Sequence, residues 1–187
     1  AYDAAMARWA DASGADVVLV GDSVGMVVQG QPDTLRVTLE DMAYHGRCVA
    51  AGLTRAHLCV DLPFMSYQAD DAEALRNAGR FMTEGNADCV KIEADRTFAP
   101  LVEKMARAGI PVVAHVGSRP QQAKMKGGYV STGRSAETAL RVLHDAAALE
   151  AAGASMILVE ACPAEVTQLV VERATVPVIG CGAGTAC

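Results

Sequence analysis

Residues 17–23 read VVLVGDS, four apolar residues followed by a glycine, an aspartate and a serine. A short apolar run without polar alternation is typical of a strand that is buried on both faces, as parallel strands are. The pattern recurs along the chain, each time with a titratable residue near its end: LCVDLP at 58–63, CVKIE at 89–93, PVVAHVG at 111–117 and MILVE at 156–160. These buried strands with charged ends decide the fold.

Helical segments alternate with the apolar runs. The sequence predicts strands at 16–21, 57–61, 88–93, 111–116, 155–160 and 176–181, and helices at 38–51, 70–84, 97–108, 135–152 and 163–173. Thr38, Asp70 and Pro163 are start signals, and Gly52, Gly85, Gly109 and Gly153 are stop signals. Three segments of the chain share a weak repeat, in which the end of a helix is followed in order by a glycine, an alanine, a strand and an acidic residue. This α/β alternation indicates either an open doubly wound sheet or a (β/α)8 barrel.

The segment after the first strand argues against a dinucleotide-binding fold. GDSVGMVVQG at 21–30 lacks the G-x-G-x-x-G fingerprint, and we expect a loop there rather than a helix. In a barrel, by contrast, catalytic groups from several strands gather at the carboxyl ends. Asp22, Asp61, Glu93, His115 and Glu160 all occupy such positions.

Composition narrows the class of protein. The chain has 187 residues, of which 51% are hydrophobic, 20% charged and 4% aromatic, which is typical of one globular domain. The net charge is -6 and no basic run indicates nucleic acid or a membrane surface, nor is any apolar segment long enough to span a bilayer. The six cysteines show no zinc spacing, and we expect a reducing, cytoplasmic location. Residues 1–14 lack signal-peptide features and look helical.

Three of the strand-end acids form a candidate metal site. Asp22, Asp61 and Glu93 offer only oxygen ligands, which suits a hard cation such as Mg²⁺. Each acid could instead cap a helix or pair with an arginine.

The other polar residues at the strand ends are candidates for substrate chemistry. Lys91 could neutralise a substrate carboxylate or form a Schiff base, or could simply lie at a strand edge. His115 could bond a substrate oxygen or be a core histidine. Glu160 stands alone in apolar surroundings, which suits a general base, although a salt bridge from a neighbouring loop is the alternative. Ser23 could hold a carboxylate or cap a helix. KGGYVSTGRS at 126–135 is a candidate lid.

Several motifs together carry a resemblance to one family: LVGDS, VTLEDMAYH, DLPFMSY, VKIE, PVVAHVG, GGY and PVIG, in this order along the chain. They resemble the ketopantoate hydroxymethyltransferases, (β/α)8 barrels of the phosphoenolpyruvate/pyruvate superfamily that are usually large homo-oligomers, decameric in many bacteria. The resemblance implies transfer of a one-carbon unit from 5,10-methylenetetrahydrofolate to 3-methyl-2-oxobutanoate through a Mg-stabilised enolate, giving ketopantoate for pantothenate synthesis.

The resemblance also implies residue roles. Asp22 and Asp61 would hold Mg²⁺, with Glu93 binding it directly or through water. Ser23, Lys91 and His115, together with the metal-binding aspartates, would bind the 2-oxo acid, and Glu160 would take its C3 proton.

Two departures from the family pattern stand out. Ser118 and Arg119 replace the usual Leu-Thr on the folate side. We also count six strands, and therefore expect residues 1–187 to be one barrel domain that lacks the first and last strands.

Three rival readings stay open. One is another Mg-dependent 2-oxo acid lyase or mutase of the same superfamily. The second is a Schiff-base aldolase that uses Lys91. The third is an inactive, truncated paralogue.

Overall fold

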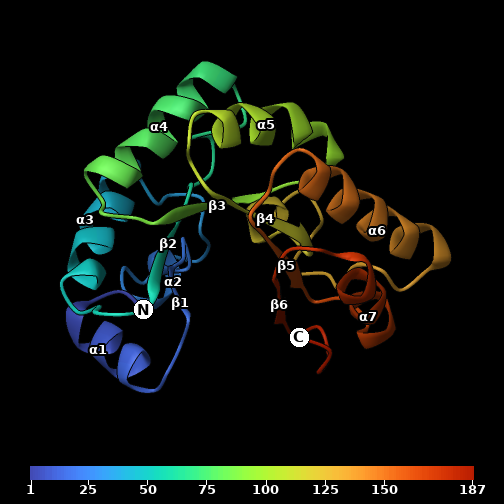
Figure 1. The fold of residues 1–187 in the computed structure, drawn as a ribbon, viewed down its shortest axis with the longest axis horizontal. Coiled ribbons are helices and arrows are strands. Elements are labelled where there is room, and N and C mark those ends of the chain that lie inside the picture. Colours follow the sequence, from blue (N-terminus) through green and yellow to red (C-terminus); the bar gives the residue numbers. More distant parts are fainter. The chain divides into compact units, whose positions relative to one another are not determined.

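The computed structural model describes residues 1–187, and its contacts divide the chain into two compact units, Ala1–Lys91 and Ile92–Cys187 (Figure 1). The elements of the first unit are α1 (Ala4–Ala12), β1 (Val17–Val20), α2 (Val24–Val27), α3 (Leu39–Ala50), β2 (His57–Asp61) and α4 (Asp71–Thr83). Strand β3 (Cys89–Glu93) runs across the division. The second unit continues with η1 (Arg96–Phe98), α5 (Ala99–Arg107), β4 (Val112–Gly117), η2 (Pro120–Gln122), α6 (Ala136–Ala151), β5 (Met156–Glu160), α7 (Ala164–Arg173) and β6 (Val178–Cys181).

The strands pair in parallel, as the apolar runs predict. In the first unit β1 pairs with β2, and β2 with β3; in the second, β4 pairs with β5, and β5 with β6. In Figure 1, α1, α3 and α4 lie along one side of the first unit's strands, and α5, α6 and α7 along one side of the second unit's. The α/β class and all six predicted strands are therefore confirmed.

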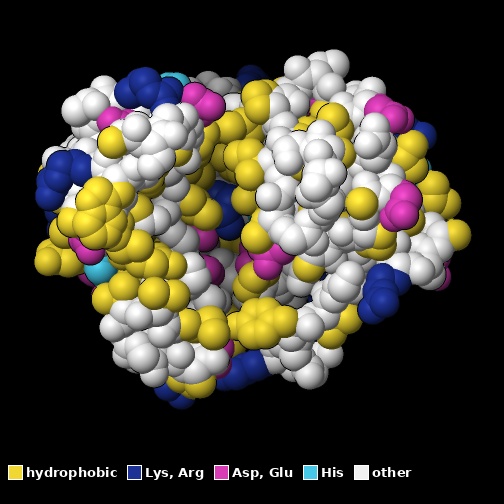
Figure 2. Space-filling model, turned by 90° about the horizontal axis from the view of Figure 1, so that it is seen from below, with side chains coloured by type: hydrophobic (Ala, Val, Ile, Leu, Met, Phe, Trp, Pro, Cys, Tyr) yellow, Lys and Arg dark blue, Asp and Glu magenta, His cyan; other side chains and the backbone are white.

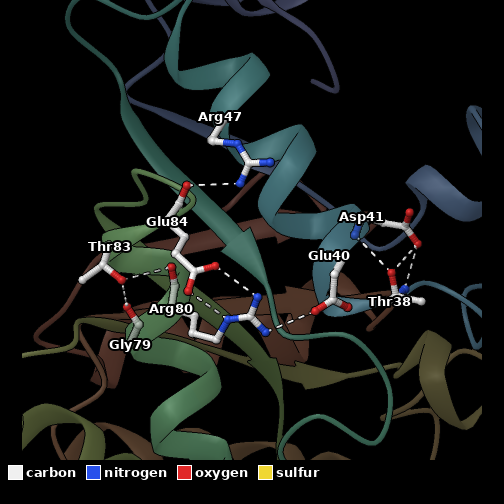
Figure 3. Close-up of polar contacts among 8 residues, drawn as sticks. All are labelled: Thr38, Glu40, Asp41, Arg47, Gly79, Arg80, Thr83 and Glu84. Atoms are coloured by element: carbon white, nitrogen blue, oxygen red, sulfur yellow. Dashed lines mark hydrogen bonds and ion pairs between the residues drawn. The ribbon is translucent and has the colours of Figure 1, made fainter.

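The predicted helix ends are also confirmed. Thr38 accepts the N–H of Asp41, and the Asp41 carboxylate accepts the N–H of Thr38, so that two free backbone donors are satisfied (Figure 3). Asp70 caps α4 in the same way by accepting from the N–H of Glu73. Helices α3, α4, α5 and α6 each end shortly before one of the four predicted glycines.

One residue, Arg80, links the last turn of α4 to the first turn of α3. Its guanidinium lies 3.0 Å from Glu84 on its own helix and 3.3 Å from Glu40 on α3 (Figure 3). Nearby, Arg47 donates to the backbone carbonyl of Glu84. Exposed pairs of this kind contribute little stability. The helices are instead held by buried side chains such as Met42 of α3 and Phe81 of α4, both fully buried.

The expectation of a loop after the first strand is wrong for residues 24–27, which form the short helix α2. Tertiary packing explains the difference. Val24 is fully buried, and a Cβ at Gly25 would lie 2.6 Å from a methyl group of Val37. The turn after β1 therefore coils tightly because Gly25 lets it approach Val37, a contact that local sequence does not reveal.

Some large hydrophobic side chains stay at the surface. Trp9 on α1 is 71% exposed and Met125 is 77% exposed. Figure 2 shows the molecule from below the view of Figure 1, so that α1 lies at its left. Hydrophobic side chains lie among charged ones over this region. No helix combines the length and the hydropathy needed to cross a lipid bilayer.

Candidate active site

The first unit brings four predicted site residues together at the carboxyl ends of its strands. Asp22 follows β1, Asp61 ends β2, and Lys91 lies opposite Asp61 in the parallel register. The Lys91 Nζ is 2.9 Å from Asp61 Oδ1, and the backbone N–H of Asp22 donates to Asp61 Oδ2 at 3.1 Å. Asp22, Asp61 and Lys91 are all buried. Strand register thus makes a buried ion pair from residues 30 positions apart.

The charge on Lys91 follows from its neighbours. Burial acts to lower the pKa of Lys91, but the Asp61 carboxylate and, further off, that of Asp22 outweigh it, so the pKa lies above its usual range. A Schiff base needs the neutral amine. The structure therefore favours Lys91 as a fixed positive charge over Lys91 as a nucleophile.

Ser23 belongs to the same cluster. A Cβ added to Gly21 would lie 2.8 Å from Ser23 Oγ and 3.5 Å from Asp61 Oδ2, so the glycine allows both groups to approach the end of β1. The Ser23 hydroxyl is hydrogen-bonded to the hydroxyl of Tyr2 at 2.8 Å. It makes no side-chain cap on α2, so the capping alternative is wrong. Tyr2 was missed by the sequence analysis because it lies outside every strand end.

The second unit pairs two more predicted residues, His115 on β4 and Glu160 at the end of β5. His115 Nε2 is 3.4 Å from Glu160 Oε2. The imidazole is 1% exposed and the carboxylate 27% exposed, so the pair is buried at the histidine and open at the acid. Glu160 is therefore not isolated, in contrast to what its apolar sequence neighbours predict.

The backbone around Glu160 is shaped by tight contacts. Gly117 has φ +94°, and a Cβ there would meet the carbonyl oxygen of Glu160. The N–H of Ser118 donates to that oxygen at 2.8 Å. Ala161, the residue after Glu160, has a backbone φ of 48°, which is unfavourable for a residue with a side chain. Such strained backbone tends to persist at functional sites.

The thiol beside Glu160 is not an activated nucleophile. Burial, and then the nearby Glu160 carboxylate, raise the pKa of Cys162 to about 11. The thiol therefore stays protonated near neutral pH.

Glu93, the third predicted metal ligand, lies in the second unit and accepts a backbone hydrogen bond there. Both carboxylate oxygens accept the N–H of Gln121 in η2 at 3.1 Å, and the side chain is buried. It thus anchors the loop that follows β4. Lys91 and Glu93 are two residues apart on β3 and so point to the same face of that strand.

The donor set of the first unit suits a hard cation in its chemistry. Asp22 and Asp61 carry buried carboxylates, the backbone N–H of Asp22 donates to the carboxylate of Asp61, and Lys91 balances one of the two negative charges. A divalent cation would more than offset the other, leaving one positive charge in the cluster. No group of three or more His, Cys, Asp and Glu side chains lies in metal-holding geometry in the structure. The metal assignment accordingly stays a prediction, with its strongest support at the two aspartates.

Comparison with known proteins gives one consistent result. The family model for ketopantoate hydroxymethyltransferase matches residues 1–187. The chain is 49% identical over 191 residues to the 3-methyl-2-oxobutanoate hydroxymethyltransferase of Anaeromyxobacter sp., covering all of this chain and 63% of that protein. It is 50% identical over 187 residues to the protein of the same name from Halorhodospira halophila, covering all of this chain and 68% of that one. The chain thus spans about two thirds of the length of these curated relatives.

A solved structure supports the fold. The phosphoenolpyruvate phosphomutase from Streptomyces platensis subsp. rosaceus matches with a TM-score of 0.71 at 16% identity, over 96% of this chain and 66% of that one. At this identity the likeness concerns the fold alone, and an incomplete (β/α) barrel fits it.

Proposed function

The chain belongs to the ketopantoate hydroxymethyltransferase family, and from this premise we propose that it transfers a hydroxymethyl group from 5,10-methylenetetrahydrofolate to 3-methyl-2-oxobutanoate. The product would be ketopantoate. The observation that carries the proposal is the match of the family over the whole chain, with the predicted site residues either on the strands or within three residues after one.

Binding of the 2-oxo acid falls to the first unit's cluster. The Lys91 ammonium, kept charged by Asp61, would attract the substrate carboxylate, and the Ser23 hydroxyl would bond one of its oxygens. Asp22 and Asp61, with Glu93, are the residues that would hold Mg²⁺. When bound, this ion would supply positive charge that polarises the 2-oxo group.

Proton removal falls to Glu160. Its carboxylate is partly exposed, whereas the nearby His115 is buried, so the acid can reach a ligand while the imidazole holds its position. Glu160 would take the C3 proton, and C3 would then bond to the methylene carbon of the donor as one of its two C–N bonds breaks. Water would replace the second nitrogen, which supplies the hydroxyl oxygen, and tetrahydrofolate would leave with a proton on each of the two released nitrogens. His115 would in addition bond an oxygen of the 2-oxo acid.

Isotope exchange tests this role without the donor. The chain, Mg²⁺ and 3-methyl-2-oxobutanoate are incubated in D₂O, and loss of the C3 proton is followed by NMR. Glu160→Gln should slow exchange by on the order of 10²–10⁴-fold, the usual worth of a positioned base. Glu165→Gln, at an exposed position of α7, is the matched control and should exchange like the wild type. Unchanged exchange by Glu160→Gln would remove Glu160 from the mechanism.

The proposal extends to assembly and location. By family resemblance the protein is a cytoplasmic homo-oligomer, with a decamer as the expected form. Light scattering coupled to gel filtration would measure its mass, and a monomer at micromolar concentration would contradict this part.

A further inference from the structure

A cavity of about 200 Å³ lies in the second unit between the segment that follows β4 and helix α6. Its lining combines apolar residues with several polar or charged side chains, among them Arg119, Gln122, Lys126, Arg141 and Asp145. Lys126 and Arg141 also line a more open groove of about 440 Å³ along residues 130–135. The cavity therefore adjoins the segment predicted as a lid.

The cations of the cavity are unequally neutralised. Arg119 Nη1 lies 2.8 Å from Asp95, and Arg141 Nη2 lies 2.8 Å from Glu137. Lys126 makes no ion pair. The charge of Lys126 thus shares the cavity with two arginine charges and has no carboxylate partner of its own.

This arrangement is unfavourable without a ligand. Burial lowers the pKa of Lys126, and the charges of Arg119 and Arg141 lower it further, against an opposing effect of Glu93. The acid in the lining, Asp145, accepts the N–H of Arg96 at 3.3 Å, and burial raises its pKa. It is therefore a weak counter-charge for the lysine.

A neutral polar group completes the lining. The buried Oε1 of Gln122 has no hydrogen-bond partner in the structure, so this acceptor can take a hydrogen bond from a water molecule or from a donor group of a ligand. Buried polar atoms are nearly always satisfied, and an orphan of this kind in a charged cavity indicates a ligand or water.

We propose that this cavity is an oxyanion subsite, in which Arg119, Lys126 and Arg141 bind a carboxylate or phosphate group of a small ligand. Guanidinium and ammonium groups are the usual partners of both anions. The subsite lies next to the candidate catalytic acid, because Gly117 lines the cavity and also contacts the Glu160 carbonyl.

Two sources share this chemistry. One is the carboxylate end of the one-carbon donor, and this source rests on the proposed function. The other is free phosphate. The binding test below does not involve Glu160, and the exchange test does not involve Lys126, so the two proposals fail independently.

Calorimetric titration of the full chain at low salt tests the subsite, with inorganic phosphate and p-aminobenzoyl-L-glutamate as probes. Lys126→Met should weaken binding about tenfold or more, since charge-assisted hydrogen bonds of this kind carry at least that factor. Lys126→Arg should bind like the wild type. The matched control is Lys124→Met, two residues away and exposed outside the cavity, which should change affinity less than about twofold.

The outcomes separate the sources. Binding of p-aminobenzoyl-L-glutamate with competition by phosphate supports the subsite and the donor as its source, whereas binding of phosphate alone supports the subsite and a free phosphate. If neither probe binds, or if Lys126→Met binds like the wild type, the subsite is refuted. Thermal unfolding should show Lys126→Met at least as stable as the wild type, because the lysine has no ion pair to lose.

Discussion

Replacing Lys91 by methionine should destabilise the protein strongly, because it leaves the Asp61 carboxylate buried without its counter-charge. The pair is 2.9 Å apart, and its side chains are 8% and 6% exposed. The backbone N–H of Asp22, 3.1 Å from Asp61 Oδ2, would still donate a hydrogen bond to the carboxylate but would bring no full positive charge. Breaking a buried pair by removing one partner costs about 3–5 kcal/mol. That is a large part of a typical unfolding free energy of about 5–15 kcal/mol.

Two effects set this magnitude. At an effective dielectric constant near 20, charges 2.9 Å apart attract by roughly 6 kcal/mol, and the cost of burying both charges offsets part of it. In the variant, Asp61 can bind a proton instead of staying charged, and this limits the loss. The loss should accordingly be smaller at pH 5 than at pH 8.

Urea unfolding followed by far-ultraviolet circular dichroism would measure the effect in a double-mutant cycle. Lys91→Met and Asp61→Asn should each lose stability, and the double variant should recover much of the loss because no unpaired charge remains. Lys104→Met on the surface of α5 is the control and should stay within about 0.5 kcal/mol of the wild type. A loss below about 1 kcal/mol for Lys91→Met, or a double variant as unstable as the sum of the singles, would refute the reasoning.

Four further variants probe local features of the fold by urea unfolding. Gly117→Ala places a Cβ against the backbone of β5 at φ +94° and should cost at least about 2 kcal/mol. Gly127→Ala, with φ +72° but open space, should cost less, and equal losses would contradict the proposed clash. Thr38→Ala removes the capping side chain of α3 and should lower the free energy of unfolding by about 0.5–2 kcal/mol. An unchanged free energy of unfolding would show that the cap does not stabilise the protein. Asp11 has its pKa lowered to about 2 by the Thr54 hydroxyl and by N–H groups of residues 54–56. Its stabilising effect is present above the unfolded pKa of about 3.9, so the deficit of Asp11→Asn should shrink as the pH falls from about 4 towards about 2, and a constant deficit would contradict it.

Local features of the sequence were enough to predict the elements. Apolar runs without alternation identified the six strands, and Thr38 and Asp70 marked helix starts correctly, because strand burial and helix capping depend on residues a few positions apart. The titratable residues at strand ends followed from the same pattern. The short helix α2 did not, because it depends on the contact of Gly25 with Val37.

Side-chain pairing was decided only by the tertiary structure. Lys91 faces Asp61 because of the register between β2 and β3, and His115 reaches Glu160 because β4 lies beside β5. These parallel strands are buried on both faces and show no polar alternation that would fix their register, so the register depends on how whole strands and helices pack. The sequence by itself therefore determined which residues stand at the ends of the strands. The packed structure decided that Lys91 stays charged, that Glu160 has a histidine partner, and that Lys126 stands beside a cavity without an ion pair.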